Sequence, residues 1–191
     1  MKNTPQPSFE AFSFSDEILS AIKKVGFETP TDIQVKTIPA VLEGRDVLAR
    51  ADTGSGKTAA FALPLLDSMS NSNVYSRIGR DNRFDGDNRV ASNCVQILVL
   101  VPTRELAIQV AEVFTQLSVD ISPEIKCQSV YGGVKINPQM MALRGGADVL
   151  VATPGRLLDL VDQNAIKFNQ IKALVIDEVD RLMKGDFQEE I

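Results

Sequence analysis

A glycine-rich stretch at residues 51–58 restricts the fold of this chain more than any other feature. It reads Ala51-Asp52-Thr53-Gly54-Ser55-Gly56-Lys57-Thr58, between a short apolar segment at 46–49 and a segment of helical character at 58–69. Glycines allow the backbone to turn sharply and to aim successive amide groups into one concave surface. We therefore expect a strand at 46–49, a tight loop, and a helix that opens directly from the loop.

The rest of the chain alternates between apolar runs of strand length and segments with helical spacing of apolar residues. Strands are expected at 95–101, 125–131, 148–152 and 173–176, and helices at 16–24, 32–42, 103–117, 137–144 and 156–161. Ser15 should cap the first helix and Gly26 should end it. The strands are apolar on both faces, which is typical of a parallel sheet covered by helices. We expect a three-layer α/β fold with a mainly parallel β-sheet flanked by helices.

The loop at 51–58 has the chemistry of a nucleotide site. Its amides and the N-terminus of the following helix attract phosphate oxygens. Lys57 would reach the β- and γ-phosphates of ATP, and the Thr58 hydroxyl would ligate Mg²⁺. Ala51 stands where the strict pattern has glycine. The alternative is a glycine-rich turn with no function.

An acidic pair follows the last expected strand. Asp177 and Glu178 come directly after the apolar run at 173–176, at the carboxyl end of a strand, where sites form in α/β proteins. Asp177 would hold Mg²⁺, and Glu178 would orient and polarise the attacking water, because phosphoryl transfer relies on positioning and charge stabilisation. The alternative is an acidic turn on the surface.

Composition excludes some classes and leaves the partner open. The net charge of −5 gives no sign of a basic nucleic-acid-binding surface, but it does not exclude local contacts with phosphates. The absence of histidine removes imidazole catalysis. Cys94 and Cys127 have no CxxC spacing and lie in or beside apolar runs, as buried thiols do. No signal peptide and no apolar run of membrane-spanning length is found, so we expect a cytoplasmic protein with no membrane partner.

Two segments lack apolar periodicity. Residues 1–8 are expected to form a flexible tail, and residues 71–93 a long exposed loop. The longer segment is either a solvated insertion or a contact for nucleic acid. The second hypothesis rests on Arg77, Arg80, Arg83 and Arg89, whose charge is diluted by Asp81, Asp85 and Asp87.

Further motifs accompany the loop and the acidic pair. In chain order they are Gly26-Phe27-Glu28-Thr29-Pro30-Thr31-Asp32-Ile33-Gln34 with Phe9 upstream, Pro102-Thr103-Arg104-Glu105-Leu106-Ala107, Gly132-Gly133, Thr153-Pro154-Gly155-Arg156, and Asp177-Glu178-Val179-Asp180. Together they resemble the motifs of the DEAD-box RNA helicases, motors built from two RecA-like domains. The resemblance covers the chain from Phe9 and implies that residues 9–191 are the first RecA-like, ATP-binding domain.

Gln34 has two interpretations. Thr31 and Gln34 have the spacing of a capping box at a helix start. The side-chain amide can also bond both the donor and the acceptor on the edge of adenine. The resemblance favours adenine recognition by Gln34 with Phe9 stacking on the base, and it assigns Phe27 and Thr29 to the same nucleotide site.

Three motifs are expected on one rim of the sheet. Thr103 and Thr153 follow strands as candidate helix caps, Pro154 suits a first helical position, and Gly132-Gly133 follows another strand. Plain helix capping would explain each alone. Together with the resemblance they imply sequence-independent binding of an RNA backbone by Pro102, Thr103, Arg104, Gly132, Gly133, Thr153, Pro154, Gly155 and Arg156. The resemblance also assigns Asp180 to coupling between the domains.

The chain departs from the family pattern in two respects. Val179 replaces the usual alanine and is expected to pack without further effect. The family's Ser-Ala-Thr motif and second RecA-like domain are not within these 191 residues, so we expect an N-terminal half that does not unwind RNA alone. An RNA clamp that uses ATP only to lock onto RNA, a DNA-directed helicase and a metabolic kinase remain as alternatives, although Asp180 and Gln34 favour RNA over DNA.

Overall fold

The computed structural model describes residues 7–70 and 95–184. The expectations for residues 1–6 and for the segment 71–93 lie outside the described residues. The chain divides into two compact units, residues 1–80 with 116–124 and residues 81–115 with 125–191. Each unit is described by itself.

The first unit is helical. A 3-10 helix at Phe9–Phe12 precedes α1 (Asp16–Val25), α2 (Asp32–Leu42) and α3 (Lys57–Ser70). Helices α1 and α2 both pack on α3. Their contact surfaces are apolar, and the side chains of Ile18, Ile38, Leu63 and Leu66 have no exposed surface.

Local sequence signals set the ends of these helices. Gly26 ends α1 as predicted, in the left-handed conformation with φ of 82°, and Ser15 occupies the predicted N-cap position, although its hydroxyl makes no capping hydrogen bond. The backbone N–H of Ser15 donates to Oδ1 of Asp67 at 2.7 Å, which ties the start of α1 to α3. At the other end of α1, Lys24 forms an ion pair with Asp120 at 2.6 Å.

The predicted strand at 46–49 is wrong. These residues adopt no regular structure, and Leu48 is 97% exposed. A strand needs a neighbour that accepts and donates its backbone hydrogen bonds. All strands of the described residues lie in the second unit, so this apolar segment has no ladder within its own unit.

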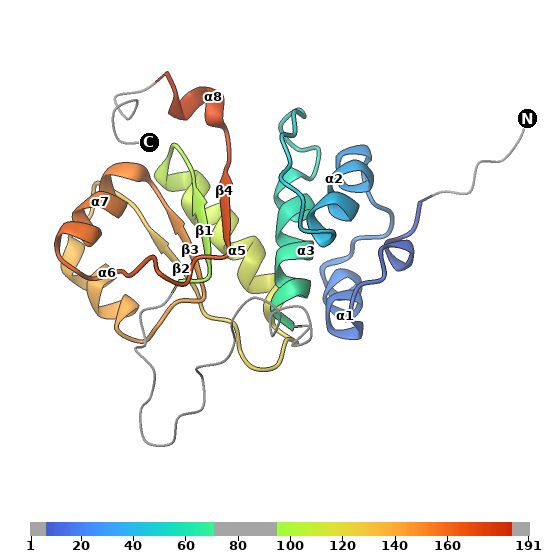
Figure 1. Ribbon diagram of the computed structural model, residues 1–191, viewed down its shortest axis with the longest axis horizontal. Helices are drawn as coiled ribbons and strands as arrows, with labels where there is room; N and C mark the ends of the chain where they lie inside the picture. Colours follow the sequence, from blue (N-terminus) through green and yellow to red (C-terminus); the bar gives the residue numbers. More distant parts are fainter. Residues whose placement is uncertain (1–6, 71–94, 185–191) are drawn as a thin grey trace, which may run out of the picture. The chain divides into compact units, whose positions relative to one another are not determined.

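The second unit contains a parallel sheet (Figure 1). The strands are β1 (Ile97–Leu100), β2 (Cys127–Val130), β3 (Val149–Ala152) and β4 (Ala173–Ile176), in the order β2-β3-β1-β4. The helices are α5 (Arg104–Ser118), α6 (Ile136–Leu143), α7 (Pro154–Asp162) and the short α8 (Val179–Leu182). Strand and helix alternate, which confirms the predicted three-layer α/β class.

The two faces of the sheet are covered by different helices. Figure 1 shows α6 and α7 on one side of the sheet and α5 on the other. Leu98 and Leu150 of the sheet pack with Leu143 of α6 and Leu160 of α7 in one core cluster. Successive strand residues point to opposite faces, and β1 and β3 are buried on both.

Strand β4 differs from the expectation that helices cover both faces of every strand. Among the described strands it pairs only with β1 and forms an edge of the sheet, where Leu174 is 56% and Ile176 39% exposed. An apolar run cannot distinguish a central strand from an edge strand, because both can have the same composition.

The Cys127 thiol is partly buried and free. Burial raises its pKa to about 12, against a smaller opposite effect of a hydrogen bond with Thr115. Cys127 is thus partly buried rather than fully buried as predicted, whereas Cys94 lies outside the described residues. In the described part of the chain, no helix combines the length and the apolar character needed to cross a membrane.

Candidate functional site

The glycine-rich loop of the first unit turns tightly into α3. Gly54 and Gly56 have φ values of 80° and 86°, a left-handed conformation that other residues rarely adopt. The Lys57 ammonium donates to the carbonyl of Ala51 at 2.6 Å and to that of Asp52 at 3.2 Å. Lys57 thus spans the loop and bonds two of its carbonyls.

The loop also contains an unsatisfied polar atom. Oγ of Ser55 is buried and has no hydrogen-bond partner among the described residues. A buried hydroxyl without a partner is costly, and a phosphate oxygen would satisfy it. The two left-handed glycines, Lys57 and Ser55 therefore fit a polyphosphate. The Thr58 hydroxyl lies in the first turn of α3, the position of a magnesium ligand in such loops.

Gln34 connects the start of α2 to this loop. Its Oε1 accepts from the backbone N–H of Thr31 at 2.9 Å, as part of a capping box, and its Nε2 donates to the carbonyl of Gly56 at 3.2 Å. The side chain is 4% exposed. Gln34 thus has the capping role that its spacing predicted, while adenine recognition stays a prediction.

The aromatic residues of the predicted adenine site lie together. Phe9 is 4% exposed and stacks on Phe27, with ring centroids 6.3 Å apart. Both rings line a hollow of about 340 Å³, together with Leu19, Ile22 and Lys23. Gln34 and Thr29 are not among its lining residues. Phe9 is therefore the more buried of the two stacked residues, and Phe27 is the more exposed.

The acidic segment of the second unit follows β4. Glu178 has φ of 50°, uncommon for a residue with a side chain, and its N–H donates to Oδ1 of Asp177 at 2.9 Å. Its carboxylate pairs with Arg181 at 2.6 Å. Asp180 is exposed, and Val179 is 42% exposed, so the expectation that Val179 packs is wrong. Its place in the first turn of α8 points it away from the core, which Leu182 fills.

The remaining motifs follow the carboxyl ends of neighbouring strands. The register pairs Leu100 with Ala152 and with Ile176, and Val130 with Ala152, so the four strands end at one edge. The segments that begin there are 101–104, 131–134, 153–156 and 177–178. The predicted rim is thus present within the second unit.

The motif residues on this rim differ in exposure. Arg104 is exposed, with its guanidinium carbon 5.4 Å from the centroid of the Tyr131 ring, and Gly132 and Gly133 are exposed. Oγ1 of Thr103 caps α5 by accepting from the N–H of Leu106 at 3.3 Å. Thr153 and Pro154 are buried at the start of α7, as the N-cap and the first helical residue.

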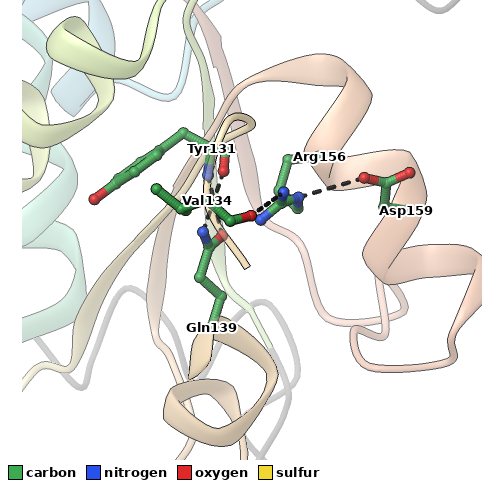
Figure 2. Close-up of polar contacts among 5 residues, drawn as sticks. All are labelled: Tyr131, Val134, Gln139, Arg156 and Asp159. Carbon is green, nitrogen blue, oxygen red and sulfur yellow. Dashed lines mark hydrogen bonds and ion pairs between the residues drawn. The ribbon is translucent and has the colours of Figure 1, made fainter. Parts of the chain in front are cut away.

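Arg156 lies inside the protein rather than on the rim surface (Figure 2). Its side chain is 8% exposed, and Nη2 donates to the carbonyl of Val134 at 2.8 Å. Nε contacts the carboxylate of Asp159 at 3.3 Å. The guanidinium therefore holds the end of the loop after β2, an arrangement that residue type and spacing did not indicate.

Sequence reasoning did not single out Tyr131, Gln139 or Asp159. The side chain of Gln139 bonds both the N–H and the carbonyl of Tyr131, each at 3.1 Å (Figure 2). No local pattern marks a glutamine inside a helix as a partner of a residue eight positions earlier, because the contact forms only when α6 folds back beside β2.

Among the described residues no three or more His, Cys, Asp or Glu side chains cluster as a metal site. Magnesium does not require such a cluster, since it is commonly held by one or two protein oxygens with phosphates and water. The hydroxyl of Thr58 and the carboxylate of Asp177 have the hard oxygen chemistry that this ion prefers.

A parallel sheet between layers of helices, together with a glycine-rich loop that opens a helix, defines a RecA-like domain of the phosphate-loop class. Residues 31–191 match the family model described as DEAD/DEAH box helicase. The chain therefore belongs to this family.

Similar proteins agree with this assignment. The ATP-dependent RNA helicase CshA of Limosilactobacillus reuteri is 39% identical over 183 residues, which cover 96% of this chain and 33% of that protein. The ATP-dependent RNA helicase DeaD of Klebsiella pneumoniae is 40% identical, over 97% of this chain and 26% of that protein. A crystal structure of a DEAD box protein from the hyperthermophile Methanococcus jannaschii matches with a TM-score of 0.76 and 36% identity, over 96% of this chain and 44% of that one. The chain thus spans about a third or less of the length of these helicase relatives.

Proposed function

We propose that this chain is the nucleotide-binding part of an ATP-dependent RNA helicase, in which RNA-stimulated hydrolysis of ATP is coupled to local unwinding of RNA duplexes. The observation that carries the proposal is the loop before α3, where Lys57 spans the turn and Oγ of Ser55 lacks a partner. The names of the similar proteins, ATP-dependent RNA helicases, support the choice of nucleotide and of nucleic acid.

Residues of both units are assigned to ATP turnover. Amides of the loop and Lys57 bind the phosphates, and Gln34, Phe27, Thr29 and Phe9 form the base site. Thr58 and Asp177 would hold Mg²⁺, which would neutralise phosphate charge when bound with ATP. Glu178 orients the attacking water.

The rim of the second unit is proposed to bind the RNA backbone without reading bases. Exposed amides at Gly132 and Gly133, the Thr103 cap and the exposed Arg104 provide neutral and positive contacts for phosphates. Such contacts explain how a chain with a net charge of −5 can bind a polyanion. A second RecA-like domain, coupled through Asp180, would provide the other half of the RNA cleft. The similar helicases are long enough to contain such a domain, because this chain covers only 33% and 26% of their length. We also propose a cytoplasmic location.

ATP turnover by the full-length chain that carries these residues tests the proposal. Poly-RNA should stimulate multiple turnovers, and Lys57→Ala or Glu178→Gln should lower the stimulated rate by about two orders of magnitude. Lys36→Ala and Glu112→Gln, at exposed positions of α2 and α5, are the matched controls and should leave the rate unchanged. Full stimulated activity in the Lys57 variant would refute the assignment.

The same assay separates the alternatives. A clamp would consume one ATP per RNA bound, a DNA-directed helicase would respond to poly-DNA as strongly as to poly-RNA, and a metabolic kinase would respond to neither. Residues 1–191 alone should bind nucleotide weakly, hydrolyse it poorly and separate no strands. Measurable unwinding by these residues alone would contradict the need for a second domain.

A further inference from the structure

The loop between β2 and α6 has two exposed glycines at its centre. Gly132 and Gly133 have no neighbouring atom within 4 Å of the position a Cβ would take, and Gly133 has φ of 78°. Among the described residues, no hydrogen bond joins their amides or carbonyls to another group. A glycine pair with this freedom would be mobile unless both ends of the loop were held.

Gln139 holds the first end. Strand β2 is an edge of the sheet, and Val130 directs its carbonyl to the N–H of Thr153 after β3. The backbone N–H and carbonyl of the next residue, Tyr131, therefore face the free edge, beside which no strand of the described residues lies. The Gln139 amide accepts from the N–H of Tyr131 and donates to its carbonyl, both at 3.1 Å, and so replaces the missing strand for one residue.

Arg156 holds the second end. Its Nη2 donates to the carbonyl of Val134 at 2.8 Å, and the contact of Nε with Asp159 fixes the guanidinium from the other side. Figure 2 shows the Gln139 and Arg156 side chains reaching the two ends of the loop from different helices, α6 and α7. The loop is thus fastened on both sides of the glycine pair and nowhere between.

We propose that Gln139, together with Arg156, is a positioning residue for nucleic-acid binding, which fixes the Gly132–Gly133 amides in the geometry that a phosphate backbone requires. The inference rests on the proposed RNA-binding function of this rim. Neither residue contacts RNA in this scheme. They hold the loop in one conformation before RNA binds. The conformational entropy cost of ordering the loop therefore does not weaken the binding of RNA.

The test replaces Gln139 with methionine, which keeps the length and helix propensity of the side chain but forms neither hydrogen bond. Gln163→Met is the matched control, because Gln163 is exposed at the end of α7. Binding of a fluorescent oligo(U) to the full-length chain is measured by anisotropy with a non-hydrolysable ATP analogue, over a series of salt concentrations. We expect Gln139→Met to bind about tenfold more weakly than the control, with unchanged affinity for the analogue.

The salt series separates positioning from direct contact. Removal of a charged phosphate contact makes the negative slope of log K against log salt shallower by about 0.7 for single strands. Misplacement of uncharged amide groups leaves the slope unchanged. We expect an unchanged slope for Gln139→Met. Gln139→Glu should bind as weakly as the methionine variant, because an ionised carboxylate cannot donate to the carbonyl of Tyr131. This second variant keeps the test valid if Gln139→Met does not fold.

The outcomes distinguish the two proposals. If the wild-type chain binds no RNA, the proposed function fails and this inference fails with it. If the wild-type chain binds RNA and Gln139→Met binds as tightly as Gln163→Met, only the positioning role is refuted. Wild-type affinity in Gln139→Glu would also refute it, since one of the two hydrogen bonds would then be dispensable.

Discussion

Gly56 is the residue at which the loop and the start of α2 meet, and its replacement by alanine has a calculable cost. A Cβ at this position would lie 2.6 Å from Nε2 of Gln34 and 3.3 Å from Oγ1 of Thr31. The Gln34 side chain is buried and bonded at both ends, to the N–H of Thr31 and to the carbonyl of Gly56. The methyl group can therefore fit only if the amide moves and loses both hydrogen bonds.

The magnitude follows from two contributions. The left-handed φ of 86° costs an alanine about 1–2 kcal/mol. Loss of the two Gln34 hydrogen bonds adds about 0.5–1.5 kcal/mol each, so the total is about 2–5 kcal/mol. Gly54→Ala has a similar backbone penalty, with φ of 80°, but meets no atom within 4 Å and should cost only about 1–2 kcal/mol.

Urea unfolding followed by circular dichroism measures these differences. We expect Gly56→Ala to be less stable than Gly54→Ala by about 1–3 kcal/mol, the cost of the two hydrogen bonds. In the double variant Gly56→Ala/Gln34→Ala the methyl group meets no amide, so the combined loss should be smaller than the sum of the single losses by the same amount. Equal stability of the two alanine variants, or simple additivity in the double variant, would refute this account of the loop.

Three further predictions concern the packing and the charges. Leu160→Ala, in the core beneath α7, should lower the free energy of unfolding by about 2–5 kcal/mol, whereas Leu158→Ala, on the exposed side of the same helix, should cost much less in the same denaturation experiment. The hydrogen bond and charge of Lys24 lower the pKa of Asp120 below 3.8, so Asp120 stabilises the fold above that pH. Asp120→Asn should therefore be less stable than wild type at pH 6, and the gap should close as the pH falls below 3.8; a constant gap would contradict the ion pair. With Cys94 replaced by serine, Cys127 should react with iodoacetamide at pH 8 far more slowly in the folded chain than in urea. The reason is that a pKa of about 12 in place of 9.0 lowers the thiolate fraction of Cys127 about a thousandfold. Equal rates would show that the thiol is not buried.

Local patterns in the sequence predicted most of the elements. The helix at 32–42 and the strand at 173–176 have the predicted bounds, and the other predicted helices and the other strands of the sheet differ by a few residues at their ends. The 3-10 helix at Phe9–Phe12 and α8 were not predicted. Gly26 ends α1 as expected, and Ser15 and Thr153 occupy the expected N-cap positions, although neither side chain makes a capping hydrogen bond. These features depend on residues within one or two turns of each other, which a linear pattern contains.

Long-range contacts decided what the patterns could not. The segment 46–49 has the composition of a strand but no ladder in its unit, and β4 is apolar but lies at an edge. Arg156 has the character of a surface phosphate ligand, yet it is buried against the carbonyl of Val134. In each case the outcome depends on which neighbour the fold supplies.

The sequence by itself determined the α/β class, the glycine-rich loop with Lys57 and Thr58, the acidic pair after β4, and the motifs that begin at the strand ends. These depend on backbone conformation and chemistry that short segments encode. Only the tertiary structure decided that Gln34, besides its predicted capping bond with Thr31, also donates to Gly56, and that Gln139 and Arg156 hold the two ends of the Gly132–Gly133 loop. A side-chain amide or guanidinium can bond many groups, and packing between distant segments selects the one that lies within reach.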